Sequence, residues 1–141
     1  MSNFDRLKNY CIDEGLKFEE KDIDGTKGLV FYETIKNAGN VTIILTFCNE
    51  METTLDVDFY GIACIDNPLK RDVLLKLLNE LNASKRFGKF IVSDTGRVYA
   101  TASFIMEENC NDFKNVMVVM SLIIRSIEDD VIGKLMKLQW S

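Results

Sequence analysis

The sequence predicts an α+β fold in which helices pack on an antiparallel sheet. Residues 29–65 and 89–106 are dominated by apolar residues that alternate with polar ones, which is the pattern of half-buried strands. The segments around them carry apolar residues at helical spacing, and no linker or repeat interrupts the chain. The expected order is α-β-β-β-α-β-β-α, and strands joined by hairpins form antiparallel sheets. We therefore expect a single domain that spans residues 1–141.

The first helix is expected at the start of the chain. Ser2 can cap its first turn, and Asp5 three residues later completes a capping box. Gly15 can adopt the left-handed conformation that often ends a helix. Its apolar side consists of Phe4, Leu7 and Cys11.

Three strands are expected next, after a short extended piece at 16–18. They cover residues 29–35, 41–48 and 54–65, and turns rich in glycine and asparagine separate them. In the third strand Leu55, Val57 and Phe59 alternate with Asp56, Asp58 and Tyr60. This alternation indicates a sheet with one face on a core and one face in water.

The second half of the chain is expected to form a helix, a hairpin and a long helix. Asn67 and Pro68 begin the helix, because an Asx residue caps free N–H groups and proline suits the first helical position. The hairpin pairs residues 89–93 with 98–106 around a turn at 94–97. Asn111 or Asp112 caps the last helix, which is expected to end near Leu138.

Composition excludes several kinds of chemistry. The 141 residues have a net charge of −5, so a nucleic acid is not an expected partner. The chain contains no histidine, which removes histidine-based catalysis and histidine metal ligands. Its four cysteines form no C-x-x-C pair, and we expect reduced, mostly buried thiols. No metal and no cofactor are expected.

The hydropathy pattern indicates a cytoplasmic protein without a membrane partner. The first eight residues are polar and lack an apolar signal core. The longest apolar run begins at Val116 and is far shorter than the about 20 residues that span a membrane.

The last helix carries apolar residues on two sides. One narrow face is suited to a sheet and consists of Phe113, Val116, Met117, Met120, Ile124, Ile127, Val131, Leu135 and Leu138. Val118 and Leu122 lie on the opposite side, with Val119 and Ile123 on the flank. Either the chain's own first helix or a loop covers these four residues, or they form a dimer interface or a partner groove.

Acidic residues offer a possible alternative site. Asp56 and Asp58 share a strand face about 7 Å apart, close enough to couple or to hold a cation. Acids on an outward strand face also serve solubility, and no third catalytic group can be identified beside them. We therefore assign no catalytic residue.

Three segments resemble the YbjN family, whose fold is that of the type III secretion chaperones. They are residues 74–82 (Leu-x-x-Leu-Leu-Asn-x-Leu-Asn), 86–90 (Arg-Phe-Gly-Lys-Phe) and 94–96 (Asp-x-Gly), and the likeness covers roughly residues 20–137. The resemblance implies an antiparallel sheet flanked by helices, an acidic surface and commonly a dimer. The related secretion chaperones bind extended segments of client proteins, and no catalytic residues carry over.

The expected function is a protein-interaction or chaperone-like module that binds itself, as a homodimer, or an unidentified client protein. Apolar patches and edge strands would accept the other chain. A small-molecule-binding regulatory domain, with a pocket between sheet and helices, is the alternative. An enzyme whose catalytic groups are carboxylates is a third hypothesis.

Overall fold

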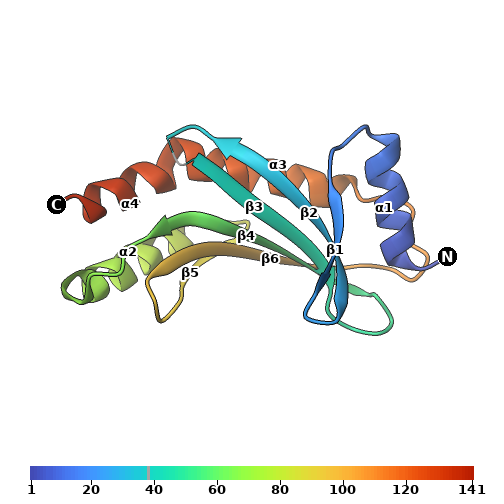
Figure 1. The fold of residues 1–141 in the computed structure, drawn as a ribbon, viewed down its shortest axis with the longest axis horizontal. Helices are drawn as coiled ribbons and strands as arrows, with labels where there is room; N and C mark the ends of the chain where they lie inside the picture. The colour runs from blue at the N-terminus through green and yellow to red at the C-terminus, as the bar shows by residue number, and fades with distance from the viewer. Residues whose placement is uncertain (38) are drawn as a thin grey trace.

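The computed structural model describes residues 1–37 and 39–141 and is built around one six-stranded sheet. The strands are β1 (Glu19–Ile23), β2 (Thr26–Ile35), β3 (Gly39–Phe47), β4 (Thr54–Cys64), β5 (Lys89–Val92) and β6 (Arg97–Ile105). Their spatial order is β1-β2-β3-β4-β6-β5, and every neighbouring pair is antiparallel (Figure 1). The predicted α+β class and antiparallel sheet are confirmed. The short extended piece expected at 16–18 leads into β1, which is an additional edge strand.

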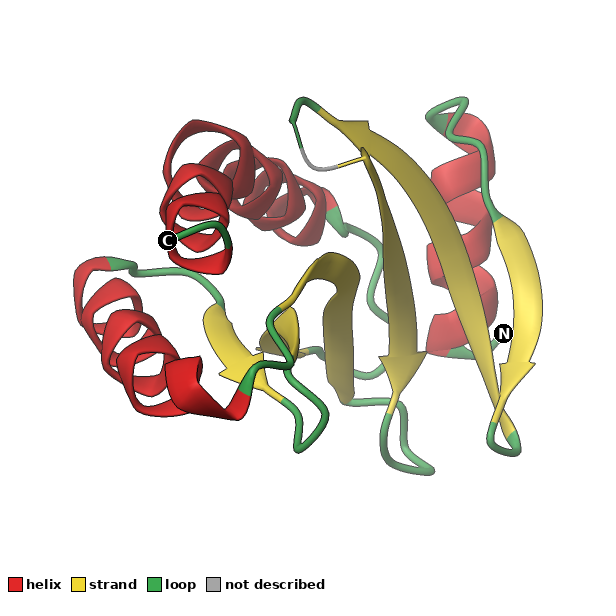
Figure 2. Cartoon of the chain, turned by 60° about the vertical axis from the view of Figure 1, so that its left-hand side comes forward, coloured by secondary structure: helices red, strands yellow, loops and turns green. Residues whose placement is uncertain are grey.

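The helices are α1 (Asn3–Asp13), α2 (Arg71–Ser84), α3 (Lys114–Ser126) and α4 (Ile132–Gln139), and a 3-10 turn, Pro68–Lys70, precedes α2. Helix α1 lies near β1, and α2 lies beside β5 at the other end of the sheet (Figure 2). Helices α3 and α4 follow one another along the sheet, and the two chain ends lie at opposite ends of the molecule (Figure 1). None of the described helices is long and apolar enough to cross a membrane.

The core lies between the helices and one face of the sheet. Alternate strand residues such as Ile43, Val57 and Phe59 are fully buried, while their neighbours Asp56 and Asp58 are half-buried on the other face. The helices contribute a matching set of buried side chains, namely Leu7, Cys11, Leu74, Leu78, Val116, Ile127, Val131 and Leu135. The alternation in the sequence therefore predicted the buried face correctly.

The predicted caps at Ser2 and Asn67 are confirmed, whereas the N-cap of α3 is Phe113 and Asp112, just before it, still accepts a bond from the first turn. Ser2 Oγ accepts a hydrogen bond from the Asp5 N–H (3.1 Å), and Asn67 Oδ1 accepts one from the Leu69 N–H (3.0 Å). Asp112 Oδ1 accepts one from the Lys114 N–H (2.9 Å) at the start of α3. Each cap satisfies an N–H group that has no partner within its own helix.

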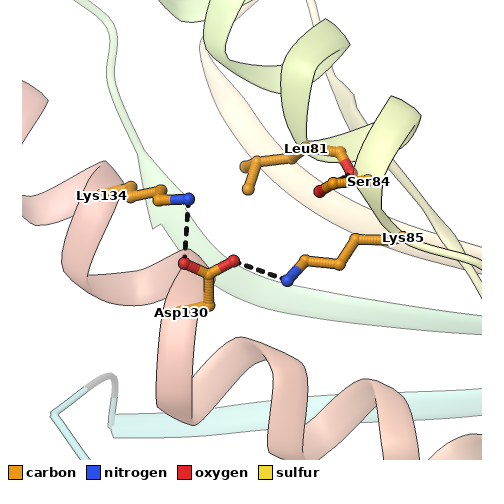
Figure 3. Close-up of polar contacts among 5 residues, drawn as sticks. All are labelled: Leu81, Ser84, Lys85, Asp130 and Lys134. Carbon is orange, nitrogen blue, oxygen red and sulfur yellow. Dashed lines mark hydrogen bonds and ion pairs between the residues drawn. The ribbon is translucent and has the colours of Figure 1, made fainter.

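The last helix is continuous but irregular. A π-helical turn, Ile127–Val131, joins α3 to α4, where the sequence predicted an unbroken α-helix. A π turn contains an additional residue and rotates the helix that follows, so Val131 and Ile132 are both buried. Asp130 in this turn binds Lys85 at the end of α2 (2.5 Å) and Lys134 of α4 (3.0 Å), which ties the two helices together (Figure 3).

Candidate protein-interaction surface

The two outer strands of the sheet have different edges. Strand β1 begins Glu19-Glu20-Lys21-Asp22, so it presents almost only charged side chains. Charged edges oppose pairing with another strand, because the added chain would have to desolvate these charges. The β1 edge is therefore protected.

The opposite edge is only half covered. Strand β5 pairs with β6 from Val92 opposite Val98 to Lys89 opposite Thr101, whereas β6 continues to Ile105. The residues that follow, Ala-Ser-Phe-Ile at 102–105, pair with β4 on one side and have no strand partner on the other within the part of the chain that the structure describes. These four residues, which we call the β6 edge, carry no charge. An uncharged strand edge is a site at which another strand can pair.

The direction of the main-chain groups follows from bonds at both ends of β6. The Arg97 carbonyl accepts from the Ser93 N–H (2.9 Å) on the β5 side, and the Met106 N–H donates to the Thr53 carbonyl (2.7 Å) on the β4 side. Main-chain groups alternate between the two sides of an antiparallel strand. Odd-numbered residues of β6 therefore face away from β4, so the N–H and C=O groups of Ser103 and Ile105 point outward.

A groove of about 300 Å³ lies beside the β6 edge. Its apolar walls are Phe87, from the loop between α2 and β5, Phe104 of β6 and Val119 of α3. A second hollow of about 430 Å³ continues past Ile105 toward Asn115. The open strand edge is therefore bordered by apolar side chains from two other elements.

The interface residues predicted from the sequence divide into two groups. Val118 is 46% exposed and Leu122 is 38% exposed, so neither is covered by the chain's own elements. Val119 lines the groove. Leu122 lies about one helical turn after Val119, and Val118 lies about one turn before Leu122, so the three side chains are neighbours on the helix surface. Ile123 is only 2% exposed and packs against Gly88, so it belongs to the core and not to the surface. The chain at Gly88 covers this flank of the helix, which the residue spacing alone could not show.

The candidate surface includes residues that sequence reasoning missed. Ile105 is 93% exposed at the end of β6, and Phe87 is half-exposed. The alternation of β6 indicated that Ile105 faces away from the core, but the lack of a neighbouring strand had no signal in the sequence. We call the β6 edge with Phe87, Val118, Val119 and Leu122 the β6–α3 surface.

Charges of opposite sign lie at the two ends of this surface. Arg86 and Lys89 are exposed beside Phe87, and Lys89 Nζ donates only to main-chain carbonyls, those of Asn82 (3.1 Å) and Lys85 (3.4 Å), among the described residues. Glu107 and Glu108 are exposed just after β6 at the other end. The surface is therefore basic at one end and acidic at the other.

The acidic pair Asp56 and Asp58 does not form part of a larger cluster. Asp56 accepts a hydrogen bond from the Ser103 hydroxyl (2.7 Å). Burial raises the pKa of Asp58, a hydrogen bond from Thr101 lowers it, and the charge of Asp56 raises it. Across residues 1–37 and 39–141, no group of three acidic or sulfur ligands is arranged to hold a metal.

The expectation of mostly buried thiols is wrong, because Cys11 is buried but Cys48 and Cys64 are exposed. All four cysteines are free, and burial raises the pKa of Cys11 to about 11. A thiol with such a pKa stays protonated at neutral pH and is a poor nucleophile.

The fold and the surface together describe an α+β protein whose prominent feature is an open strand edge beside an apolar helix face. The model of the YbjN family, described as "Putative bacterial sensory transduction regulator", matches residues 3–130. The chain belongs to this family. A search of curated proteins finds no match.

Proposed function

We propose that this protein is a non-catalytic interaction module that binds another chain through the β6–α3 surface. The observation that carries the proposal is the uncharged half of β6 without a second strand neighbour. An added strand would bond to the outward main-chain groups of Ser103 and Ile105, and main-chain bonds supply affinity in such complexes. The apolar groove beside the edge would receive alternate side chains of that strand.

The chain that fits this surface best is a second copy of the same protein. Antiparallel pairing of two β6 edges centred on Phe104 would place residue 103 opposite 105 and would direct residue 107 of one copy toward position 101 of the other, where β5 begins. Because Lys89 neighbours Thr101, Glu107 of one copy would then approach Lys89 and Arg86 of the other. The opposite charges at the two ends of the surface are therefore complementary under a two-fold axis, as a closed dimer requires.

The first test is substitution of Ser103 by proline. Proline lacks an N–H group, and the one at Ser103 points away from β4, so the sheet of the single chain loses no main-chain bond and only the exposed hydroxyl bond to Asp56. We expect the wild type to be a dimer and Ser103→Pro a monomer in sedimentation equilibrium, with unchanged circular dichroism. A wild type that is monomeric at high concentration, or a Ser103→Pro variant that stays dimeric, would refute the proposal.

The charge complementarity has its own test. Arg86→Glu should weaken the dimer by placing two acids together, and so should Glu107→Arg by placing cations together. The double variant restores opposite charges across the interface and should recover most of the lost affinity. Leu69→Lys is the control, because Leu69 is 90% exposed on a different surface and should leave association unchanged. Failure of the double variant to recover affinity would show that the occupant is not a second copy in this register.

A further inference from the structure

The register of β4 against β6 is interrupted near one end of the sheet. Phe59 pairs with Ala100 and Ala63 with Val98, so three residues of β4 lie opposite the single residue Tyr99. Gly61, in this bulge, has φ +87°, and a Cβ there would lie 3.2 Å from the Asn40 carbonyl oxygen. Glycine therefore allows the strand to swing out, and Tyr60, Gly61 and Ile62 have no register partner on β6.

A cavity of about 400 Å³ occupies this irregularity, between the bulge, the start of β6 and helix α4. Cavities of this size fall within the range of small-molecule sites, which is about 300–1,000 Å³. Its apolar lining consists of Ile62, Ala63, Val98, Ile132 and Met136. The π turn that precedes Ile132 sets the rotation of α4 and so determines which of its side chains face the cavity.

Helix α4 is held over the cavity by bonds from other elements. Lys70 Nζ donates to the carbonyls of Leu138 (3.0 Å) and Gln139 (2.7 Å), and Gln139 Nε2 donates to the Cys64 carbonyl (3.2 Å). These bonds link the end of α4 to β4 and to the turn before α2. They fix the walls of the cavity, so a ligand would not have to order them.

The polar side chains that line the cavity are a cation, Arg97, two phenol hydroxyls, of Tyr60 and Tyr99, and the amides of Asn37 and Gln139. The guanidinium of Arg97 forms no ion pair among the described residues, because the ion pairs found there all involve lysines. Tyr60 and Tyr99 stack with ring centroids 5.6 Å apart. Burial, followed by the charge of Asp58, raises the pKa of Tyr60, so its hydroxyl stays protonated at neutral pH.

We propose that this cavity binds a small amphipathic carboxylate, with its acid group on Arg97 and the tyrosine hydroxyls and its apolar body against Ile62, Ile132 and Met136. An arginine can hold a carboxylate through two parallel hydrogen bonds. A phosphate dianion is less suited, because the cavity offers one arginine and adjoins the C-terminal, negative end of α4. The site is separate from the β6–α3 surface and does not depend on the proposed dimer.

Octanoate and octanol form a matched pair of probes, because they differ in the charged group and share the apolar chain. We expect saturable shifts of the Gly61 amide and the Met136 methyl in NMR titrations with octanoate, and weaker binding of octanol. Arg97→Gln should weaken octanoate binding about tenfold, since it removes a charge-assisted hydrogen bond, and should leave octanol binding unchanged. The control, Arg86→Gln, removes a cation from the β6–α3 surface and should have no effect.

Three results would overturn this assignment. They are the absence of saturable shifts at Gly61 and Met136, equal octanoate binding by the Arg97→Gln variant, and shifts confined to the β6–α3 surface. Sedimentation of the same samples reports dimer formation independently, so failure of the ligand site and failure of the dimer can be distinguished.

Discussion

At the scale of single residues, charge and burial assign different roles to carboxylates that look alike in the sequence. Asp129 and Asp130 are neighbours in the π turn, but only Asp130 forms ion pairs among the described residues. On the open face of the sheet, Asp56 and Asp58 are two residues apart, and burial is the largest cause of the raised pKa of Asp58. The position of each side chain in the fold decides whether its charge stabilises the folded state.

Asp130→Asn should destabilise the protein at neutral pH. Hydrogen bonds from Lys85 and then Lys134 lower the pKa of Asp130, so its ionised form favours the folded state. This stability is present above the unfolded-state pKa, near 4, and is lost as pH falls through the lower folded-state pKa. For a partly exposed pair we expect a loss of up to about 1 kcal/mol in urea unfolding at pH 7. Asp129→Asn is the control, and equal losses in both variants would contradict the assignment.

Asp58→Asn should have the opposite effect. The raised pKa of Asp58 means that ionisation favours the unfolded state as pH rises past the unfolded-state value near 4. The amide removes this cost, so we expect a higher Tm at pH 7 and a smaller difference at pH 3. Asp56→Asn removes only the repulsion between the two carboxylates, which is the smallest of the causes, so it should raise the Tm by less. A lower Tm for Asp58→Asn would show that its carboxylate is structurally required.

At the scale of elements, the hairpin of β5 and β6 creates the open edge. The longer strand β6 joins β4, and the four-residue strand β5 lies outside it and covers only part of its length. Gly88, immediately before β5, has φ +76°, and a Cβ there would lie 2.9 Å from Ile123 Cδ1. The glycine thus lets the chain pass close to α3 before β5 begins, which places Phe87 beside the groove.

Helix α3 provides the test of the apolar surface. Val118→Asp with Leu122→Asp should abolish dimer formation and leave the helical circular dichroism unchanged, because both side chains are exposed in the single chain. Size-exclusion chromatography with light scattering would measure the change. Loss of helicity in this double variant would mean that both residues are needed for folding and would contradict an interface role.

At the scale of the whole molecule, the core and the interaction surface should respond differently to truncation. Ile127→Ala removes a fully buried side chain at the π turn and should cost about 2–5 kcal/mol of unfolding free energy. Ile105→Ala should leave the unfolding free energy of the monomer unchanged and weaken association. Chemical unfolding at low protein concentration measures the first effect, and sedimentation the second. A large stability loss in Ile105→Ala would place this residue in the core.

The sequence by itself determined the inward face of the protein and most of its secondary structure, apart from strand β1 and the π turn. Capping residues such as Ser2 and Asn67 act within a single turn, and alternation in β3, β4 and β6 reports which side of each strand is apolar. Both signals are local, because they depend on neighbours a few residues apart. They were sufficient for the α+β class, the antiparallel sheet and most of the core.

The tertiary structure alone decided which surfaces remain open. The choice of β6 to pair with β4, the burial of Ile123 against Gly88, and the cavity at the Gly61 bulge all depend on contacts between segments that are distant in the chain. An apolar residue on a helix flank has the same local pattern whether a strand covers it or solvent does. Exposure is a property of the packed molecule, so Val118 and Ile123 could be separated only when their neighbours were in place.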